Sequence, residues 1–486
     1  MPTVRLIGHQ FSFQISDVLR LFYGPEIKVN DDCLTAGDEK PLINSSLLSC
    51  EDGLNRIETC LPDQADLPSY HATVTEKLIR REVKRQLYLC LSDLTGLKFP
   101  WGSLTGIRPT QVAAEAIARN ESLVAAGREL IDHWFVSPAK AELAIETALT
   151  EQRLLAQIPP DSALVYLGVP FCPSRCDYCS FIAQDALRRV NMLAPYVDAV
   201  IAETETFFAG LTQPLTVSVV YVGGGTPTSL PDHLFARLLD GVLSKLPSLP
   251  NFELTIEAGR PDTITPAKLQ IIQSTGANRL CINPQTFHDN TLARIGRRHS
   301  TLQTVESFRL ARSVGFDNIN MDLIAGLPGE SPADFAESLL QAMALGPDSI
   351  TVHTLSMKRS SRLSDQQKKS GAQVGLPDPA LAAMLQEAGN RLKSAGLLPY
   401  YLYRQKDVAG GLENTGFARN GEGCLYNVGM MSDQRSVIGL GSGAISKKVV
   451  GDRVVRTPNP RDIADYIART AELAGRKLAI FNSDMR

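Results

Sequence analysis

The sequence predicts an α/β protein whose middle part is a series of parallel β/α units. Two observations support this prediction. Between Leu164 and Leu355, short β-branched runs alternate with helical stretches, and strands that alternate with helices form parallel sheets with right-handed crossovers. The chain also has 486 residues and 44% hydrophobic composition, which suffices for about two to three domains with their own cores.

The first region, 1–158, is expected to be an α+β accessory domain. After Val4 the sequence alternates like a strand, and Ser16–Tyr23 looks helical. Between Thr73 and Leu94 the apolar residues fall near one stripe, which predicts an amphipathic helix. A turn-rich segment and two further helical stretches follow, and Pro159 and Pro160 mark a domain boundary.

The second region, 159–360, contains the β/α units. We expect strands at Leu164–Val169, Ser218–Val222, Glu253–Glu257, Arg279–Asn283, Asn318–Ile324 and Ser349–Thr354. Helices are expected near 190–209, 232–245, 266–275, 302–314 and 332–345. The side chains that follow such strands gather at one edge of the sheet, where this architecture places its chemistry.

The third region, 361–486, is expected to form a C-terminal α+β cap. It contains a helical stretch near 380–395, an aromatic and basic run at Pro399–Lys406, and a glycine-rich run at Ile438–Ser446. The glycine-rich run lies too late in the chain, and outside any βαβ context, to be a dinucleotide fingerprint.

Three cysteines, Cys172, Cys176 and Cys179, directly follow the first strand with the spacing C-x3-C-x2-C. Three thiolates on one short loop can hold three irons of a [4Fe-4S] cluster and leave the fourth iron open for a ligand. A zinc knuckle or a redox dithiol could also use part of this motif. However, no Cys or His lies between Cys179 and His233 to supply a fourth zinc ligand nearby, and a dithiol needs only two of the three cysteines.

The cysteine spacing resembles the signature of radical S-adenosylmethionine (radical SAM) enzymes. This resemblance implies a partial (β/α)6 barrel, a [4Fe-4S] cluster and S-adenosylmethionine bound to the open iron. In that superfamily, an electron from the cluster cleaves the cofactor and releases a 5′-deoxyadenosyl radical.

Other polar residues lie at the ends of the expected strands. Gly223–Gly225 follow the second strand, where glycines allow a close approach of backbone to ligand, or form an ordinary tight turn. Glu257 and Asp322 lie within apolar strands, so each needs a partner. The partner could be a ligand, or an internal cation such as Arg297.

A closer resemblance spans nearly the whole chain. Tyr166, the cysteine loop, Gly223–Thr228, the Pro-Gln-Thr-Phe segment and Asp322–Gly329 look like the oxygen-independent coproporphyrinogen III oxidases and dehydrogenases, and most like their HemZ-type branch. The resemblance implies that Cys172, Cys176 and Cys179 ligate the cluster. It implies that one or two S-adenosylmethionine molecules contact Tyr166, Tyr178, Gly224, Gly225, Thr226, Glu257, Gln285, Arg297, Asp322, Ser356 and Ile445.

One position departs from the family pattern. Phe181 stands where the authentic oxidases have a fourth cysteine, and a phenylalanine there is usual in relatives that act as haem chaperones. That cysteine is not a cluster ligand in the family, so the departure concerns turnover rather than cluster assembly.

The resemblance implies a tetrapyrrole substrate, with two propionates of coproporphyrinogen III converted to vinyl groups. Four carboxylates favour basic residues at the barrel mouth, and we expect Lys358 and Arg359 to bind a propionate. Two alternatives remain open: a haem chaperone on the same scaffold, with His353 as a possible axial ligand, and a radical SAM tetrapyrrole methyltransferase or haem-degrading enzyme. We expect Tyr400, Tyr401 and Tyr403 to be core residues between the barrel and its cap, and His353 to be a hydrogen-bonded barrel residue.

Charge, cysteine count and hydropathy predict the partners and the cellular compartment of the protein. The net charge of −3 argues against nucleic acid as a partner. Nine cysteines, an odd count, fit a reducing cytosol, and the start of the chain lacks the apolar core of a signal peptide. No apolar run reaches the ~20 residues needed to span a bilayer. We expect a cytoplasmic monomer that receives electrons from a donor such as flavodoxin or ferredoxin.

Overall fold

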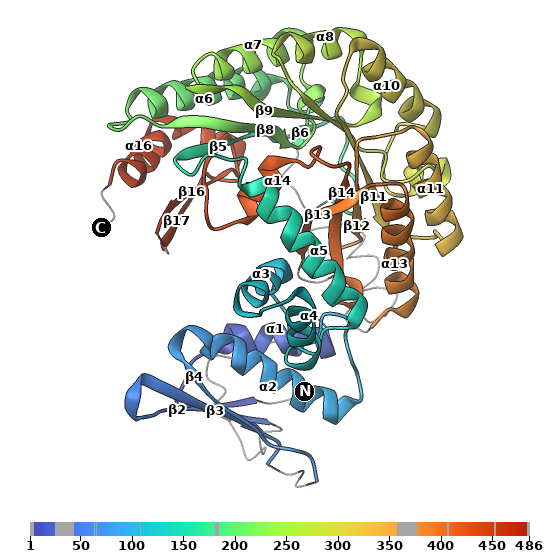
Figure 1. Ribbon diagram of the computed structural model, residues 1–486. Coiled ribbons are helices and arrows are strands. Elements are labelled where there is room, and N and C mark those ends of the chain that lie inside the picture. Colours follow the sequence, from blue (N-terminus) through green and yellow to red (C-terminus); the bar gives the residue numbers. More distant parts are fainter. Residues whose placement is uncertain are drawn as a thin grey trace.

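The computed structural model describes residues 4–24, 43–62, 64, 66–106, 108–179, 184–356, 377–405, 408–451 and 453–483. A curved sheet with helices on its outer face forms the larger part of the molecule (Figure 1). A small N-terminal sheet with its own helices lies apart from it, and α5 (Pro138–Leu155) runs between the two (Figure 1).

The N-terminal sheet has the order β1-β2-β3-β4 in the described residues, with β1 at Val4–Ile7, β2 at Ile43–Ser49, β3 at Leu54–Cys60 and β4 at Tyr70–Thr75. Two helices, α1 (Ser12–Tyr23) and α2 (Ile79–Thr95), share its apolar core. The predicted helix from Thr73 was wrong at its start, because 73–75 belong to β4 and pair with β3. The β-branched run Thr73-Val74-Thr75 fits an extended strand better than a helix.

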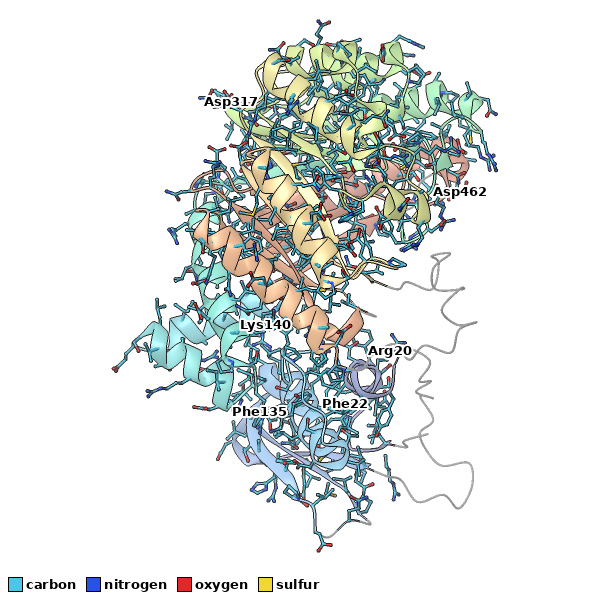
Figure 2. The ribbon with its side chains drawn as sticks, turned by 90° about the vertical axis from the view of Figure 1, so that its right-hand side faces the viewer. Arg20, Phe22, Phe135, Lys140, Asp317 and Asp462 are labelled. Atoms are coloured by element: carbon cyan, nitrogen blue, oxygen red, sulfur yellow. The ribbon has the colours of Figure 1, made fainter. Side chains whose placement is uncertain are left out.

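The N-terminal part is joined to the rest by buried polar contacts. Trp101 donates its indole N–H to Glu413 at 2.7 Å, and Lys140 of α5 forms an ion pair with the same carboxylate. Figure 2 places Lys140 between the N-terminal part, where Phe22 lies, and the curved sheet. Two more helices of this part, α3 (Pro109–Arg119) and α4 (Leu123–Asp132), pack with α5 around Trp101.

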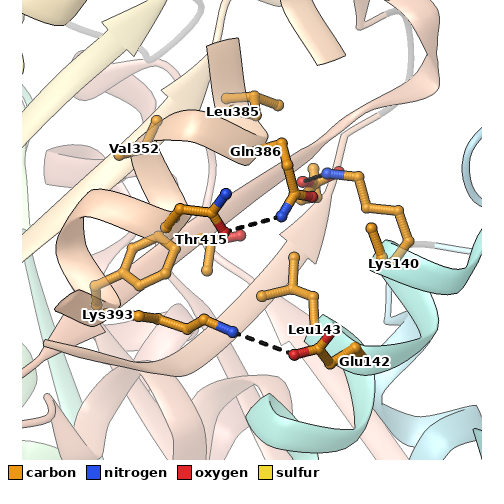
Figure 3. Close-up of a pocket in the computed structure, with 13 residues that line it drawn as sticks. Lys140, Glu142, Leu143, Val352, Leu385, Gln386, Lys393 and Thr415 are labelled. Carbon is orange, nitrogen blue, oxygen red and sulfur yellow. Dashed lines mark hydrogen bonds and ion pairs between the residues drawn. The ribbon is translucent and has the colours of Figure 1, made fainter. Parts of the chain in front are cut away.

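A small cavity of about 70 Å³ lies at this junction, between α5, α13 (Pro379–Ser394) and β14 (Glu413–Ala418). Figure 3 shows Lys393 of α13 reaching Glu142 of α5 across its edge, an ion pair of 3.4 Å. The cavity lies between structural contacts and is too small for a cofactor.

Six parallel strands form the centre of the curved sheet, as predicted. They are β5 (Ser162–Val169), β8 (Thr216–Gly224), β9 (Ser248–Gly259), β10 (Arg279–Ile282), β11 (Ile319–Ala325) and β12 (Ser349–Thr354). The covering helices are α6 (Val190–Ala209), α7 (Asp232–Leu243), α8 (Pro266–Ser274), α10 (Thr301–Val314) and α11 (Pro332–Ala344). Each of these predicted strands and helices is present, and most of their ends differ by a few residues.

The C-terminal strands extend this sheet at both edges. Beyond β12 come β14 and β13 (Leu398–Arg404), which contains the aromatic run. On the other side β15 (Ser436–Leu440) lies parallel to β5, followed by β16 (Ile445–Val450) and β17 (Arg453–Pro458). The residues expected to form a cap therefore continue the barrel sheet, and the domain boundaries at 158 and 360 remain a prediction.

The glycine-rich run has a structural role. Gly441 donates its N–H to Glu203 of α6, and a Cβ at Gly441 would lie 2.4 Å from the Tyr196 hydroxyl oxygen. Glu203 also pairs with Lys477 of α16 (Thr470–Phe481) and accepts from Tyr466. This network fixes the loop between β15 and β16 against α6.

Candidate active site at the carboxyl ends of the strands

The three cysteines lie on a loop that begins at β6 (Phe171–Cys172), beyond the end of β5. Gly225 and Thr226 hold this loop, since they donate their backbone N–H groups to Val169 and Phe171 carbonyls at 2.8 and 2.7 Å. A Cβ at Gly225 would lie 2.4 Å from the Phe171 oxygen. The glycine run is therefore required by the close approach of the cysteine loop.

The cysteine sulfurs have polar neighbours. Thr226 donates its hydroxyl to Cys172 at 3.4 Å, and burial raises the pKa of Cys172 to about 12. Such a thiol is protonated at neutral pH unless a metal displaces the proton. No three potential ligands in the described part of the chain are close enough to hold a single metal ion, whereas in a cubane cluster each cysteine binds its own iron.

Arg260 is a site residue that the sequence argument missed. It is 2% exposed and donates to the Ser174 hydroxyl at 2.7 Å, and its Nη1 lies 3.9 Å from the Cys176 sulfur. Asp262 pairs with it through two hydrogen bonds of 2.9 and 2.7 Å. The signal was present as Arg-Pro-Asp directly after β9, but a charged residue in a loop is normally read as exposed.

The two carboxylates within the strands have partners other than Arg297. Glu257 accepts from the Tyr221 hydroxyl and from the Gly224 N–H, and burial raises its pKa to about 7. Asp322 accepts from Asn320 at 2.8 Å and lies 3.5 Å from the His353 Nε2. Burial opposes its ionisation, but hydrogen bonds from His353 and Asn320 hold the pKa of Asp322 below its usual range.

Arg297 instead faces the cysteine loop, where it hydrogen-bonds Tyr178 and Cys176 and donates to the Asn283 carbonyl. Among the buried polar atoms of the described residues that have no hydrogen-bond partner are Arg297 Nε and Asn283 Oδ1. Both side chains line a cavity. Buried polar groups are normally hydrogen-bonded, so these atoms fit a polar ligand.

Gln285 has a strained backbone, with φ at 74°. Its N–H donates to the Asp322 carbonyl at 2.9 Å, and its carbonyl accepts from Ile324 at 3.0 Å. These two bonds to β11 hold Gln285 in the left-handed region. Such outliers concentrate at functional sites.

A single cavity of about 750 Å³ brings the predicted residues together. It is lined by all of the described residues assigned from the sequence: Tyr166, Cys172, Cys176, Tyr178, Cys179, Gly224, Gly225, Thr226, Glu257, Gln285, Arg297, Asp322, Ser356 and Ile445. Their roles as ligands remain predictions. Lys358, Arg359 and Phe181 lie outside the described residues.

Three stacked tyrosines form an aromatic wall of the same cavity. Tyr221 and Tyr426 have ring centroids 4.7 Å apart, and Tyr166 stacks on both at 6.4 and 5.9 Å. Tyr400 and Tyr401 are buried as expected, and Tyr401 and Tyr403 also line the cavity. Tyr221 and Tyr426 were not found from the sequence, since tyrosine in a strand or helix is usually core.

Three cations and one carboxylate line the part of the cavity formed by β16, β17 and the segment just before α3. Arg108 and Arg456 pair with Asp433 at 2.8 and 3.2 Å. Lys447 donates to the Met430 carbonyl at 2.9 Å, and burial lowers the pKa of Lys447 to about 8. This region, called here the basic end, carries more positive than negative charge.

Comparisons with known proteins agree with this architecture. Residues 166–342 match the profile of the Radical SAM superfamily. The oxygen-independent coproporphyrinogen-III oxidase-like protein HemZ of Bacillus subtilis is 36% identical over 83% of this chain and 82% of its own length. The chain therefore belongs to the radical SAM family.

Within that family it falls in the group of HemZ-, HemW- and HemN-like proteins. The heme chaperone HemW of Bacillus subtilis is 29% identical over 62% of this chain and 75% of its own length. The crystal structure of the Escherichia coli coproporphyrinogen III oxidase HemN aligns with a TM-score of 0.53 at 25% identity, over 68% of this chain and 73% of HemN. The predicted radical SAM barrel is thereby confirmed, with an N-terminal α+β region and additional C-terminal strands.

Proposed function

We propose that the protein catalyses the oxygen-independent oxidative decarboxylation of coproporphyrinogen III, which converts two propionates to vinyl groups and gives protoporphyrinogen IX. The observation that carries this proposal is the shared cavity, in which the cysteine loop, the aromatic wall and the basic end meet. Its volume of about 750 Å³ lies toward the upper end of the range for small-molecule sites, about 300–1,000 Å³.

The residues near the cysteine loop fit the cofactors of the family. Cys172, Cys176 and Cys179 would hold a [4Fe-4S] cluster, and Glu257 and Asp322 would accept hydrogen bonds from S-adenosylmethionine. When bound, the cluster and S-adenosylmethionine together supply a carbon radical that can abstract hydrogen from an unactivated position. The protein's part is to orient the cofactor, to exclude water and to position the substrate.

The aromatic wall and the basic end of the cavity suit a flat molecule with carboxylates. The aromatic wall offers a surface for a tetrapyrrole, since stacked rings and flat ligands pack well. Arg108, Lys447 and Arg456 would attract propionates because charge-assisted hydrogen bonds favour carboxylates. The clamp formed by Lys358 and Arg359 is retained as a prediction.

The proposed reaction also needs an electron donor and a cellular compartment. We infer a cytoplasmic monomer that takes electrons from a donor such as flavodoxin or ferredoxin and has no nucleic acid partner. In the described part of the chain, no helix is long and apolar enough to cross a bilayer. One or two molecules of S-adenosylmethionine would bind, with Ser356 and Ile445 among the contacts.

The deciding experiment is anaerobic turnover. The cluster is reconstituted and reduced, S-adenosylmethionine and coproporphyrinogen III are added, and 5′-deoxyadenosine and porphyrin mass are followed together. Deoxyadenosine coupled to the loss of two carbon dioxides is the expected result. Deoxyadenosine with unchanged substrate, or with S-adenosylhomocysteine or an opened tetrapyrrole, would assign a different radical reaction. A Cys176→Ala control should lose both iron and activity.

A haem chaperone is the second candidate, because Phe181 replaces the oxidase cysteine and several HemW proteins are similar to this chain. His353 is a poor axial ligand here, since its Nε2 faces Asp322 and its Nδ1 lies 3.4 Å from the Tyr403 hydroxyl. A haem titration followed by absorbance separates the two functions. Tight haem binding without deoxyadenosine release would favour the chaperone.

A further inference from the structure

Exposed arginines lie on both sides of the loop that carries the three cysteines. We call this group the arginine collar. Its members are Arg175, Arg188, Arg189, Arg294 and Arg298, and each is exposed. The mechanism proposed above uses none of them, and none of them lines the cavity.

On one side, the collar is attached to the first cysteine. Asp185 pairs with Cys172 between β6 and β7 (Gln184–Asp185), and Ala186 donates its N–H to the Cys172 carbonyl at 2.9 Å. The next four residues, 187–190, are all exposed. The Arg188 side chain is 86% exposed, and its apolar neighbours Leu187 and Val190 are 72% and 62% exposed.

On the other side, the segment after α9 (Asp289–Arg294) contacts the middle of the loop. Asp177 donates its N–H to the Ile295 carbonyl at 3.0 Å, and the Ser174 hydroxyl donates to the Gly296 carbonyl at 3.2 Å. Arg294 and Arg298 flank this segment. The collar is thus fixed to the cysteine loop through backbone contacts on both sides.

The charge of this surface is opposite to that of the whole protein. The acidic neighbours within the same segments are Asp177, Asp185 and Asp289, so the five arginines leave a formal excess of two positive charges, whereas the chain has a net charge of −3. A local patch of one sign steers a partner of the opposite sign. Arginine beside exposed apolar side chains is also typical of protein interfaces.

We propose that the arginine collar is the docking surface for a small acidic one-electron carrier protein of the reduced flavodoxin type, with Leu187 and Val190 as the apolar centre of the contact. This inference rests on the proposed function, because only a cluster on the cysteine loop requires such a carrier. In each transfer the carrier loses one electron and is oxidised, and the cluster gains that electron and is reduced. No covalent bond forms or breaks.

The test compares a protein donor with a small chemical one. In the variant Arg188→Glu/Arg189→Glu, reduction of the reconstituted cluster by reduced flavodoxin, followed by stopped-flow absorbance at low salt, should slow by about tenfold or more. Reduction of the same variant by dithionite should keep the wild-type rate. Added salt should slow the flavodoxin reaction of the wild type and leave that of the variant nearly unchanged.

A matched control carries the same charge change elsewhere. Arg128 on α4 and Arg309 on α10 are exposed and lie outside the collar, so Arg128→Glu/Arg309→Glu should reduce at the wild-type rate with both donors. A flavodoxin rate that is equal in the collar and control variants would overturn the proposal. So would collar variants that lose only self-association or nucleic acid binding.

A second pair of variants decides the outcome if Arg188→Glu/Arg189→Glu loses iron or reacts slowly with dithionite. Arg298→Glu and Leu187→Ser change the two sides of the collar separately, and each should slow only the flavodoxin reaction. Cluster reduction is measured in the absence of substrate, so its rate does not depend on the proposed decarboxylation. If that reaction does not occur, a separate turnover assay gives no product with either donor, while the docking result stands.

Discussion

Lys477 forms an ion pair with Glu203 in which both side chains are almost completely buried, 1% and 0% exposed. The pair joins α16 to α6, and Glu203 also accepts from Gly441 and Tyr466. The last helix is therefore tied through one carboxylate to the loop between β15 and β16. Residues near the end of the chain thus help to hold the strand beside β5.

Removing the cation of this pair should destabilise the fold. Lys477→Met leaves the Glu203 carboxylate buried without its charge partner, which we expect to cost about 3–5 kcal/mol. Chemical unfolding followed by circular dichroism measures this. The double variant Glu203→Gln/Lys477→Met should recover part of the loss, because it leaves no buried charge. Equal stability of wild type and Lys477→Met would contradict the role given to the pair.

Cofactor binding should strengthen as the pH rises through about 7. Burial raises the pKa of Glu257 to about 7, so its carboxylate, the form that accepts hydrogen bonds from a ligand, is the minor form below that pH. Affinity for S-adenosylmethionine should be about tenfold weaker at pH 6 than at pH 8. Equilibrium dialysis on the reconstituted protein measures this, and Glu257→Gln should bind weakly with little pH dependence.

Arg260 should raise the reduction potential of a cluster on the cysteine loop. Positive charge and hydrogen bonds near cluster sulfurs favour the reduced form, and the Arg260 guanidinium lies 3.9 Å from the Cys176 sulfur. Arg260→Gln should therefore lower the midpoint potential, and Asp262→Asn, which removes the opposing charge, should raise it. A redox titration followed by electron paramagnetic resonance gives both values. Shifts of the same sign in the two variants would refute this role.

Substrate binding at the basic end should weaken above pH 8. Burial lowers the pKa of Lys447 to about 8, so the ammonium that attracts a carboxylate is lost as the pH rises through this value. Fluorescence titration with coproporphyrin III should show weaker binding at pH 9 than at pH 7. Lys447→Met should bind weakly at both pH values, while its binding of S-adenosylmethionine should not change.

The sequence predicted the barrel well because the two kinds of element differ in period and length. The expected strand at Ser349–Thr354 and the expected helix at 190–209 have the same ends as β12 and α6. The error at Thr73 arose because an apolar stripe was extended across residues that pair with β3. The spacing of apolar residues along the sequence does not show which strand a segment will pair with.

The site residues also fall into two groups, those that a local motif predicts and those that it does not. Residues carried by short motifs, such as the three cysteines and Gly224–Thr226, were found because their spacing is local. Tyr426 and Lys447 were missed as site residues, because each reaches the cavity only through the packing of distant segments. Arg108 likewise reaches the cavity beside Asp433, 325 positions later. Arg260 directly follows β9 and was missed for a different reason, since an arginine in a loop is normally read as exposed.

The order of strands around β5 has a consequence for synthesis. On one side β5 pairs with β8, but on the other it pairs with β15, which begins at Ser436. Roughly 270 residues separate the two, so a ribosome that adds about 5–20 residues per second needs on the order of half a minute to supply this neighbour. During that time the strand leading to Cys172 has an open edge. The cysteine loop is thus complete, and reachable by whatever delivers iron and sulfur, well before the sheet beside it closes.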